Sequence, residues 1–547
     1  MRFVFHNGFW KGMAALLLSL SGLSCQKTTE DPGPELTAVQ VQESQVTLEE
    51  GGTGSLTFRV TPADYVFSTD VASADCPVSL VTLNNVSPTH FRLASLARIG
   101  EAGTYTATLE DNGSGEDYAE LIHLRIQDHG KMVLSSRFTV ASAEKPFVPE
   151  TGLPIIYLDT DAPITSKEDY VNGVLRIDGQ GVADGLEEAV CQVRGRGNTT
   201  WTWPKKPYLI KFDKKQSLFG MPKHKRWILL ANFMDRTMMR NLLAMKISSM
   251  TKLDWTPRCQ SVELILNGKH VGNYLLIEQI RVDANRVPVA EMTVEDNEGE
   301  AVTGGYLLES DFHYDNPYQW LSPYGRSNQW IEGRNNVIPF GIKYPDEEDV
   351  TPAQIAYIKD YVDKTAQALY GPDFTDPDKG YAAWLDVDSY VDYWLVFEVL
   401  GNHELGNPGS VYMHKDRGGK LIAGPVWDFD WGVLSYKTSP QAQYGLLNEQ
   451  AIWYARLFED PAFRAKVKAR FEELLPQLET IPAYIDQLEA QLEKSAGLNF
   501  LLWNPAQDAS QNGGQIINGD ENLSFHEAVR RLRANYVERL SVIRAHL

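Results

Sequence analysis

Two aspartates separated by one residue lie among three aromatic side chains in Trp427-Asp-Phe-Asp-Trp431. Carboxylate oxygens are the hard ligands that Mg²⁺ and Mn²⁺ prefer, and in an extended chain Asp428 and Asp430 point to one face. An isolated Asp-x-Asp is usually a solvated turn, but two carboxylates among large apolar rings are costly to bury unless they are paired or metal-bound. We therefore predict a divalent-metal site at Asp428 and Asp430.

A third carboxylate, Glu404, is expected on a loop that follows a helix. Apolar residues recur at helical spacing after Asp388, which is interpreted as the helix cap, and Gly401 ends the pattern. The polar residues Asn402-His403-Glu404 come directly afterwards. A carboxylate in this position is a candidate general base.

A predicted hairpin brings Glu404 close to Asp428. Residues 410–415 and 420–426 have the pattern of two strands, and Asp416-Arg-Gly-Gly419 is typical of the turn between them. In a hairpin the start of the first strand lies beside the end of the second. The loop that carries Glu404 is therefore predicted to lie next to Asp428.

Basic residues are concentrated between positions 194 and 246. Thirteen Lys and Arg residues stand there against two aspartates, which gives +11 in a chain whose formal charge is -21. A solvated basic face is the ordinary explanation of such a run. The segment also contains Arg194-Gly-Arg-Gly-Asn-Thr-Thr200, whose glycines allow backbone amides to approach an anion, so we predict phosphate binding in this segment.

Lys211 lies in the strand-like run Tyr208-Leu-Ile-Lys-Phe212, on the face opposite its aromatic residues. A lone lysine on an apolar strand usually extends into water, whereas in a nucleotide site it can reach between phosphates. Glu278, which ends Tyr274-Leu-Leu-Ile-Glu278, could pair with Lys211 or form an ion pair elsewhere.

The elements around these residues predict two folded parts. Apolar and polar residues alternate through residues 37–145, which favours an all-β sandwich, and Glu101-Ala-Gly-Thr-Tyr105 is similar to the corner-tyrosine turn of immunoglobulin-like domains. A boundary rich in Pro and Gly precedes a second part, 154–547, predicted as an α+β domain with a helical C-terminal half. Its clearest helical patterns are 352–370, 452–496 and 522–547, the last two flanking a polar loop with Gly513-Gly514.

The first 24 residues have the pattern of an export signal. Basic residues precede an apolar stretch too short to span a membrane, so residues 1–24 are predicted to be a signal peptide. Leu23-Ser-Cys25 is similar to a bacterial lipobox, which predicts lipidation at Cys25, a polar tether over 25–36 and a membrane anchor in the cell envelope. An ordinary cleaved signal with a coincidental cysteine is the alternative.

Composition excludes some classes of function. The charge of -21 argues against a nucleic-acid partner, which needs a basic surface. Beyond Cys25 the cysteines are Cys76, Cys191 and Cys259, with no CxxC pair, so neither a zinc site nor a disulfide framework is expected. These three are predicted to be buried apolar residues rather than reactive thiols.

Eight segments of the chain together resemble the spore coat protein H (CotH) kinase family. They are Arg196-Gly-Asn-Thr-Thr-Trp201, Lys206-Pro-Tyr-Leu-Ile-Lys-Phe-Asp213, Trp227-Ile-Leu-Leu-Ala-Asn-Phe-Met-Asp-Arg236, Arg240-Asn241, Val262-Glu-Leu-Ile-Leu-Asn-Gly268, Tyr274-Leu-Leu-Ile-Glu-Gln279, Gly304-Gly-Tyr-Leu-Leu-Glu309 and Gly424-Pro-Val-Trp-Asp-Phe-Asp430. The resemblance implies an atypical, minimal kinase-like fold that uses ATP and Mg²⁺ or Mn²⁺ and takes Ser, Thr or Tyr hydroxyls of proteins as acceptors.

The resemblance also implies roles for individual residues. Asp428 takes the position of the metal aspartate, Lys211 that of the phosphate lysine, and Arg196 with Asn198 that of the turn over the nucleotide. Many relatives have Asn-x-Asp where this chain has Asn402-His403-Glu404, a departure that bears on catalysis rather than on the fold.

Three functions fit the sequence. The first is phosphoryl transfer, with Glu404 acting on the acceptor, Asp428 and Asp430 holding the metal, and Lys211 and Arg196 gripping phosphate. The second is a catalytically inactive nucleotide- or metal-binding module. The third is a surface lipoprotein that binds glycan or protein, which 13 Trp and 24 Tyr and the scarcity of ATP outside the cytoplasm favour.

Overall fold

The computed structural model describes residues 34–128, 130–143, 147–313, 316–326, 337–503, 518–520 and 522–547. The predicted signal peptide, Cys25, most of the tether and Gly513-Gly514 lie outside these ranges. Within them, no helix combines the length and apolar character that a membrane crossing requires.

The N-terminal part consists of two four-stranded sheets around one core, as the alternating pattern predicts. The sheets run β1-β3-β6-β5 and β2-β8-β7-β4. The strands are β1 (Ala38–Val41), β2 (Gln45–Leu48), β3 (Thr53–Thr61), β4 (Val78–Thr82), β5 (Phe91–Arg98), β6 (Thr104–Asp111), β7 (Ala119–Asp128) and β8 (Lys131–Ser142). Buried Phe58 and Leu109 of the first sheet belong to the same core cluster as Ile122 and Phe138 of the second.

The expected corner tyrosine makes a long-range contact instead. The Tyr105 hydroxyl donates to the backbone oxygen of Tyr65 at 3.3 Å, 40 residues earlier, whereas a corner tyrosine bonds only a few residues upstream. The immunoglobulin-like character of residues 37–145 therefore stays a prediction.

A closed seven-stranded barrel follows, in the order β10-β11-β12-β13-β15-β14-β9. Its strands are β9 (Ile155–Thr160), β10 (Val171–Asp178), β11 (Leu186–Gly195), β12 (Tyr208–Gln216), β13 (His224–Leu230), β14 (Cys259–Leu266) and β15 (Lys269–Glu278). Apolar residues at every second position, such as Ile210 and Phe212, fill its interior. Two helices, α1 (Thr199–Thr202) and α2 (Arg240–Ser248), interrupt the strand sequence.

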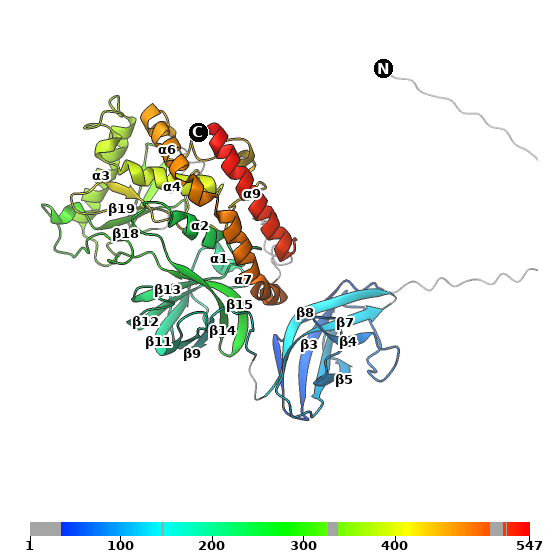
Figure 1. Ribbon diagram of the computed structural model, residues 1–547. Coiled ribbons are helices and arrows are strands. Elements are labelled where there is room, and N and C mark those ends of the chain that lie inside the picture. The colour runs from blue at the N-terminus through cyan, green and yellow to red at the C-terminus, as the bar shows by residue number, and fades with distance from the viewer. Residues whose placement is uncertain are drawn as a thin grey trace, which may run out of the picture.

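A second sheet, β17-β18-β16-β19-β20, carries the remaining strands. These are β16 (Tyr306–Ser310), β17 (Gln319–Ser322), β18 (Ile338–Tyr344), β19 (Val411–Lys415) and β20 (Leu421–Ala423). The helices around it are α3 (Pro352–Tyr370), α4 (Val387–Val399), α5 (Tyr454–Leu457), α6 (Pro461–Leu478), α7 (Ile481–Leu502) and α9 (Phe525–His546), with 3-10 turns η1 (Ala301–Thr303), η2 (Tyr381–Ala383) and η3 (Pro440–Gln443). Figure 1 shows the barrel below this helical region, with the N-terminal sheets beside the barrel and next to the lower end of α7.

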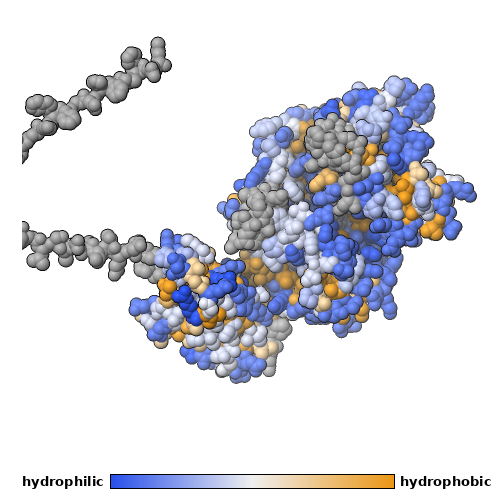
Figure 2. Space-filling view, turned by 180° about the vertical axis from the view of Figure 1, so that it is seen from behind, coloured by the Kyte–Doolittle hydropathy of each residue, from blue (hydrophilic) through white to orange (hydrophobic). Residues whose placement is uncertain are grey.

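The structure confirms the helix over 352–370 and the helices of the C-terminal tail, and it corrects two boundaries. The cap of α4 is Asp386, whose carboxylate accepts from the Ser389 N–H at 2.8 Å, while Asp388 lies inside the first turn. The second hairpin strand ends at Ala423 rather than at residue 426. On the face seen in Figure 2, hydrophilic residues predominate and hydrophobic ones form small separate patches, in keeping with the high charge.

Candidate functional site

Five predicted site residues line one cavity of about 510 Å³. Arg196 and Asn198 come from the turn after β11, at the end of the barrel. Glu404 comes from the loop after α4, and Asp428 and Asp430 from the loop after β20. The structure thus brings together residues that are more than 200 positions apart in the sequence.

The two aspartates meet, but not for the reason the sequence suggested. Asp428 has a φ of 64°, so the chain is not extended there and the same-face argument is wrong. The two carboxyl groups nevertheless hydrogen-bond to each other. Burial raises the pKa of Asp428 and, together with the charge of Asp428, raises the pKa of Asp430 well above its ordinary value.

Two asparagines from distant segments hold this loop. The Phe429 N–H donates to Asn241 Oδ1 at 2.9 Å, from the first turn of α2. Asn518 Oδ1 accepts from the Gly432 N–H at 2.9 Å, and Asn518 Nδ2 donates to the backbone oxygen of Asp430 at 2.9 Å. The backbone on both sides of Asp430 is therefore fixed by side-chain amides.

A buried ion-pair network supports the same loop. Arg240 donates from Nε to the backbone oxygen of Val433 at 2.9 Å and pairs with Asp235 and, at 2.7 Å, with Asp520. Arg240 and the two aspartates are almost fully buried. Because a buried arginine needs such partners, this network fixes where the polypeptide leaves the site.

Glu404 lies beside the aspartates, so the placement predicted from the hairpin is confirmed. Gly401, with a φ of 59°, ends α4, and the Glu404 N–H then donates to Asn402 Oδ1 at 2.8 Å. Burial, followed by the charges of Asp428 and Asp430, raises the pKa of Glu404 well above its ordinary value. Glu404 Oε2 is buried and has no hydrogen-bond partner among the described residues.

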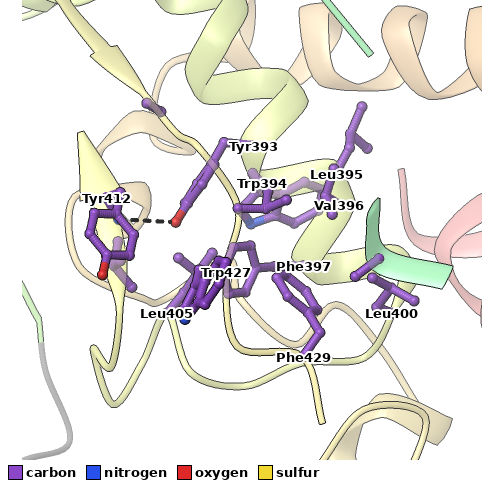
Figure 3. Close-up of a cluster of buried hydrophobic side chains, with 14 of the residues drawn as sticks. Tyr393, Trp394, Leu395, Val396, Phe397, Leu400, Leu405, Tyr412, Trp427 and Phe429 are labelled. Carbon is purple, nitrogen blue, oxygen red and sulfur yellow. Dashed lines mark hydrogen bonds between the residues drawn. The ribbon is translucent and has the colours of Figure 1, made fainter. Parts of the chain in front are cut away.

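Aromatic residues of α4 contact the loop of Asp428 and Asp430 and strand β19 (Figure 3). The rings of Phe429 and Phe397 lie 4.7 Å apart, and the Tyr412 N–H donates to the Tyr393 hydroxyl at 3.3 Å. Trp427 is also buried, as predicted, but Trp431 is 37% exposed. Two of the three expected aromatic anchors therefore serve that role.

The basic segment divides between the cavity and solvent. Arg194, Arg196 and Lys205 line the cavity, and Arg196 lies 5.6 Å from the ring of Trp427. Gly197 has a φ of 85°, and a Cβ there would come within 2.0 Å of Thr200 Oγ1, so the turn requires glycine. The solvated-face interpretation holds for the exposed basic residues of this segment, which are Lys214, Lys215, Lys223, Lys225 and Lys246.

The suggested pairing of Lys211 with Glu278 is wrong. In the barrel β13 lies between β12 and β15, so the two residues are on strands that do not touch. Glu278 instead accepts from Arg258 Nε at 2.8 Å and lies 3.8 Å from Arg286. Lys211, which lies 5.7 Å from the Tyr170 ring, lines neither this cavity nor the one described next.

A second, smaller cavity of about 210 Å³ adjoins the first and was not anticipated from the sequence. Its apolar walls include Leu209 and Ile228 of the barrel and Leu307 of the second sheet. Residues 279–282, which leave β15, form one side, and Gln279 Oε1 is buried there without a hydrogen-bond partner in the described part of the chain. Residues common to both cavities are Arg194, Arg196, Lys343, Tyr412 and Trp427.

The sequence did not indicate an individual role for two lysines near the cavities. Lys343 of β18 forms an ion pair with Glu309 of the neighbouring β16, with Nζ and Oε2 3.0 Å apart. Lys205 is buried and donates to Asn499 Oδ1 at 2.7 Å, and burial lowers the pKa of Lys205 to about 7. A Lys in an apolar strand and a Lys beside Pro carry no signal of their own, so only the three-dimensional pairing identifies them.

The carboxylates of the cavity have the ligand chemistry that a divalent cation requires. No group of three or more His, Cys, Asp or Glu side chains in the described ranges is already arranged around a metal position. Asp428 and Asp430 nevertheless supply hard oxygens that a cation could bind, and Glu404 adds a buried oxygen without a partner among the described residues.

Comparison with known proteins supports the resemblance seen in the sequence. Residues 193–543, well over half of the chain, match the family described as CotH kinase protein. No curated protein matches the chain. Two solved structures, each of a marsupial T cell receptor, share 12% identity, cover 32% of this chain and 93% and 91% of their own, and have a TM-score of 0.15, which carries no argument about the fold. The chain therefore belongs to the CotH kinase family.

Proposed function

We propose that this chain transfers the γ-phosphoryl group of ATP to a hydroxyl group of a protein, with the help of Mg²⁺ or Mn²⁺. The observation that carries the proposal is the acidic cavity, in which Arg196, Glu404, Asp428 and Asp430 line one space beside a second, smaller cavity. Kinases need this combination, because their catalysis rests on positioning and charge neutralisation of phosphate rather than on covalent chemistry.

The smaller cavity is suited to the nucleobase. Leu209 and Ile228 line it from the barrel side, and Leu307 lines it from the second sheet. The buried Gln279 Oε1, which has no partner among the described residues, is an acceptor for an exocyclic amine such as that of adenine. The nucleobase would then lie beside residues 279–282, the segment that leaves β15 and connects the barrel to the rest of the domain.

The acidic cavity is suited to the phosphates. Arg196 offers a planar guanidinium to phosphate oxygens and is held near Trp427, 5.6 Å from its ring. Asp428 and Asp430 are the residues that would hold the divalent cation, which supplies charge neutralisation at the phosphates when it is bound. The amide clamps on this loop keep the two carboxylates in place before any ligand arrives.

Glu404 is proposed to act on the acceptor. As the acceptor oxygen forms its bond to the γ-phosphorus, the bond to the ADP oxygen breaks and the hydroxyl proton passes to Glu404. The loop has room for the extra methylene relative to aspartate, because Gly406 and Gly409 lie between Glu404 and β19. We place this activity on an exported lipoprotein anchored through Cys25, from the signal and lipobox pattern alone.

The test compares the chain from residue 26 onward with its Asp428→Asn variant in labelled ATP with Mg²⁺ or Mn²⁺. Transfer of label to itself or to an added protein by the parent but not by the variant supports the proposal. ATP binding without transfer under any condition would indicate an inactive nucleotide-binding module, which the Glu404 departure favours. Absence of nucleotide binding would leave a surface protein that binds glycan or protein.

A further inference from the structure

The passage between the two cavities is lined by cations from both sides. A nucleotide whose base occupies the smaller cavity and whose γ-phosphate reaches Asp428 must place its α- and β-phosphates along the residues that both cavities share. Arg194 and Arg196 approach this passage from the barrel side, at the end of β11. Lys343 is the shared cation that comes from the opposite side, on β18.

Lys343 is held in place by Glu309. Glu309 has a side chain that is only 13% exposed, pairs with Lys343 at 3.0 Å and interacts electrostatically with the Tyr412 hydroxyl. Because β16 lies between β18 and β19, Glu309 is anchored by residues of both neighbouring strands. This ion pair holds the ammonium group of Lys343 beside the residues that both cavities share.

Protein kinases require a lysine on the nucleotide phosphates and a glutamate that pairs with that lysine. In this chain the barrel lysine, Lys211, lines neither cavity, and its suggested partner Glu278 is occupied by Arg258. The Lys343–Glu309 pair has the required chemistry and lies at the required place. We propose that Lys343 binds the α- and β-phosphates of the nucleotide and that Glu309 is its positioning residue; this inference rests on the proposed function.

The experiment measures binding of ATP, ADP and adenosine by calorimetry with Mg²⁺ present. Lys343→Met is expected to weaken ATP and ADP roughly tenfold or more, the loss typical of a charged hydrogen bond, and to leave adenosine within about twofold. Lys343→Arg should retain most of the affinity for ATP. Lys214→Met is the matched control, an exposed lysine of strand β12 outside both cavities, and should bind all three ligands like the parent. Lys211→Met tests the rival assignment of the phosphate ligand.

The role of Glu309 is tested by comparing the ATP affinity of single and double variants of Glu309 and Lys343. Glu309→Gln should weaken ATP binding, and the double variant Glu309→Gln/Lys343→Met should be no weaker than Lys343→Met alone, because the carboxylate acts through the lysine. Thermal unfolding of each variant verifies that the fold is intact.

Four results would overturn the inference, and they are distinguishable. Parent-like ATP affinity in Lys343→Met removes the lysine from the phosphate site. Equal weakening of adenosine and ATP shows a structural role only. If the parent binds ATP but Lys211→Met loses it while Lys343→Met does not, the barrel lysine is the phosphate ligand. A parent that binds no nucleotide in any metal overturns the proposed function and this inference with it.

Discussion

The side-chain carbonyl of Asn241 accepts the backbone N–H of Phe429 at 2.9 Å, across 188 positions of sequence. Phe429 lies between the two aspartates of the acidic cavity, so the first turn of α2 sets the spacing of their carboxylates. Both Asn241 and Phe429 are buried, and water does not readily replace this bond.

Asn241→Ala should therefore impair phosphoryl transfer by at least roughly tenfold and lower the free energy of unfolding by about 1–3 kcal/mol, the cost of an unsatisfied buried donor. Asn172→Ala, at an exposed asparagine of the barrel, is the control and should change neither. Chemical denaturation and the labelled-ATP assay provide the two measurements. A fully active Asn241→Ala protein would show that the loop keeps its geometry without this bond.

Arg539 should be among the most sensitive positions for stability. It is fully buried and donates to the backbone oxygen of Glu398 at 2.9 Å as well as to the Glu398 carboxylate. Arg539→Met leaves that carboxylate buried without its cation and should cost about 3–5 kcal/mol in urea unfolding. On the same helix, Arg533→Met removes only the half-exposed pair with Asp486 and should cost about 1 kcal/mol or less.

Replacement of Glu404 separates chemistry from nucleotide binding. Glu404→Gln should reduce the rate of transfer by about 100-fold or more and leave the ATP dissociation constant within about twofold, because the base contacts the acceptor. Glu404→Asp, which restores the residue common in relatives, should keep measurable activity. Parent-like turnover in Glu404→Gln would exclude a base role for this residue.

The free energy of unfolding is predicted to depend on pH through Lys205. Burial lowers the pKa of Lys205 to about 7, against 10.5 in the unfolded chain, and only the charge of Glu263 opposes this shift. Around it lie the Tyr274 ring at 4.4 Å and Asn499. Between these two pKa values the unfolded chain binds one more proton, so the free energy of unfolding should rise with pH by about 1.4 kcal/mol per unit.

Lys205→Met removes this contribution, and the difference between parent and variant isolates it from other titrating groups. Urea unfolding at several pH values between 7 and 10.5 measures both slopes. Identical slopes in the two proteins would show that Lys205 stays protonated in the folded state.

Membrane attachment is predicted to depend on Cys25. The polar tether that follows it offers no apolar anchor, so Cys25→Ser should move the protein from the membrane pellet to the soluble fraction. Retention in a salt-washed pellet would contradict lipidation as the means of attachment.

Local patterns in the sequence were sufficient for several parts of the site. Alternation and a Gly-Gly turn predicted the β19–β20 hairpin, and that hairpin placed Glu404 beside Asp428. Helical spacing and Gly401 likewise predicted α4, although the cap was assigned two residues too late because both Asp386 and Asp388 suit a cap.

Long-range pairing decided what could not be predicted. Two consecutive strands of the sequence, β12 and β13, are neighbours in the barrel, yet β13 then pairs with β15, which separates Lys211 from Glu278. Similarly, the Lys343–Glu309 pair depends on the order of strands in the second sheet. Neither order is encoded in the local pattern of apolar residues.

The ion pair between Arg240 and Asp520 joins residues 280 positions apart. It supports the loop that carries Asp428 and Asp430, because Arg240 also donates to the backbone oxygen of Val433. Asn518, which holds the same loop by hydrogen bonds, is synthesised only two residues before Asp520. A nascent chain that has not yet been synthesised past residue 520 therefore lacks the contacts that fix the loop of Asp428 and Asp430. During translation this loop would be fixed among the last features of the protein to form.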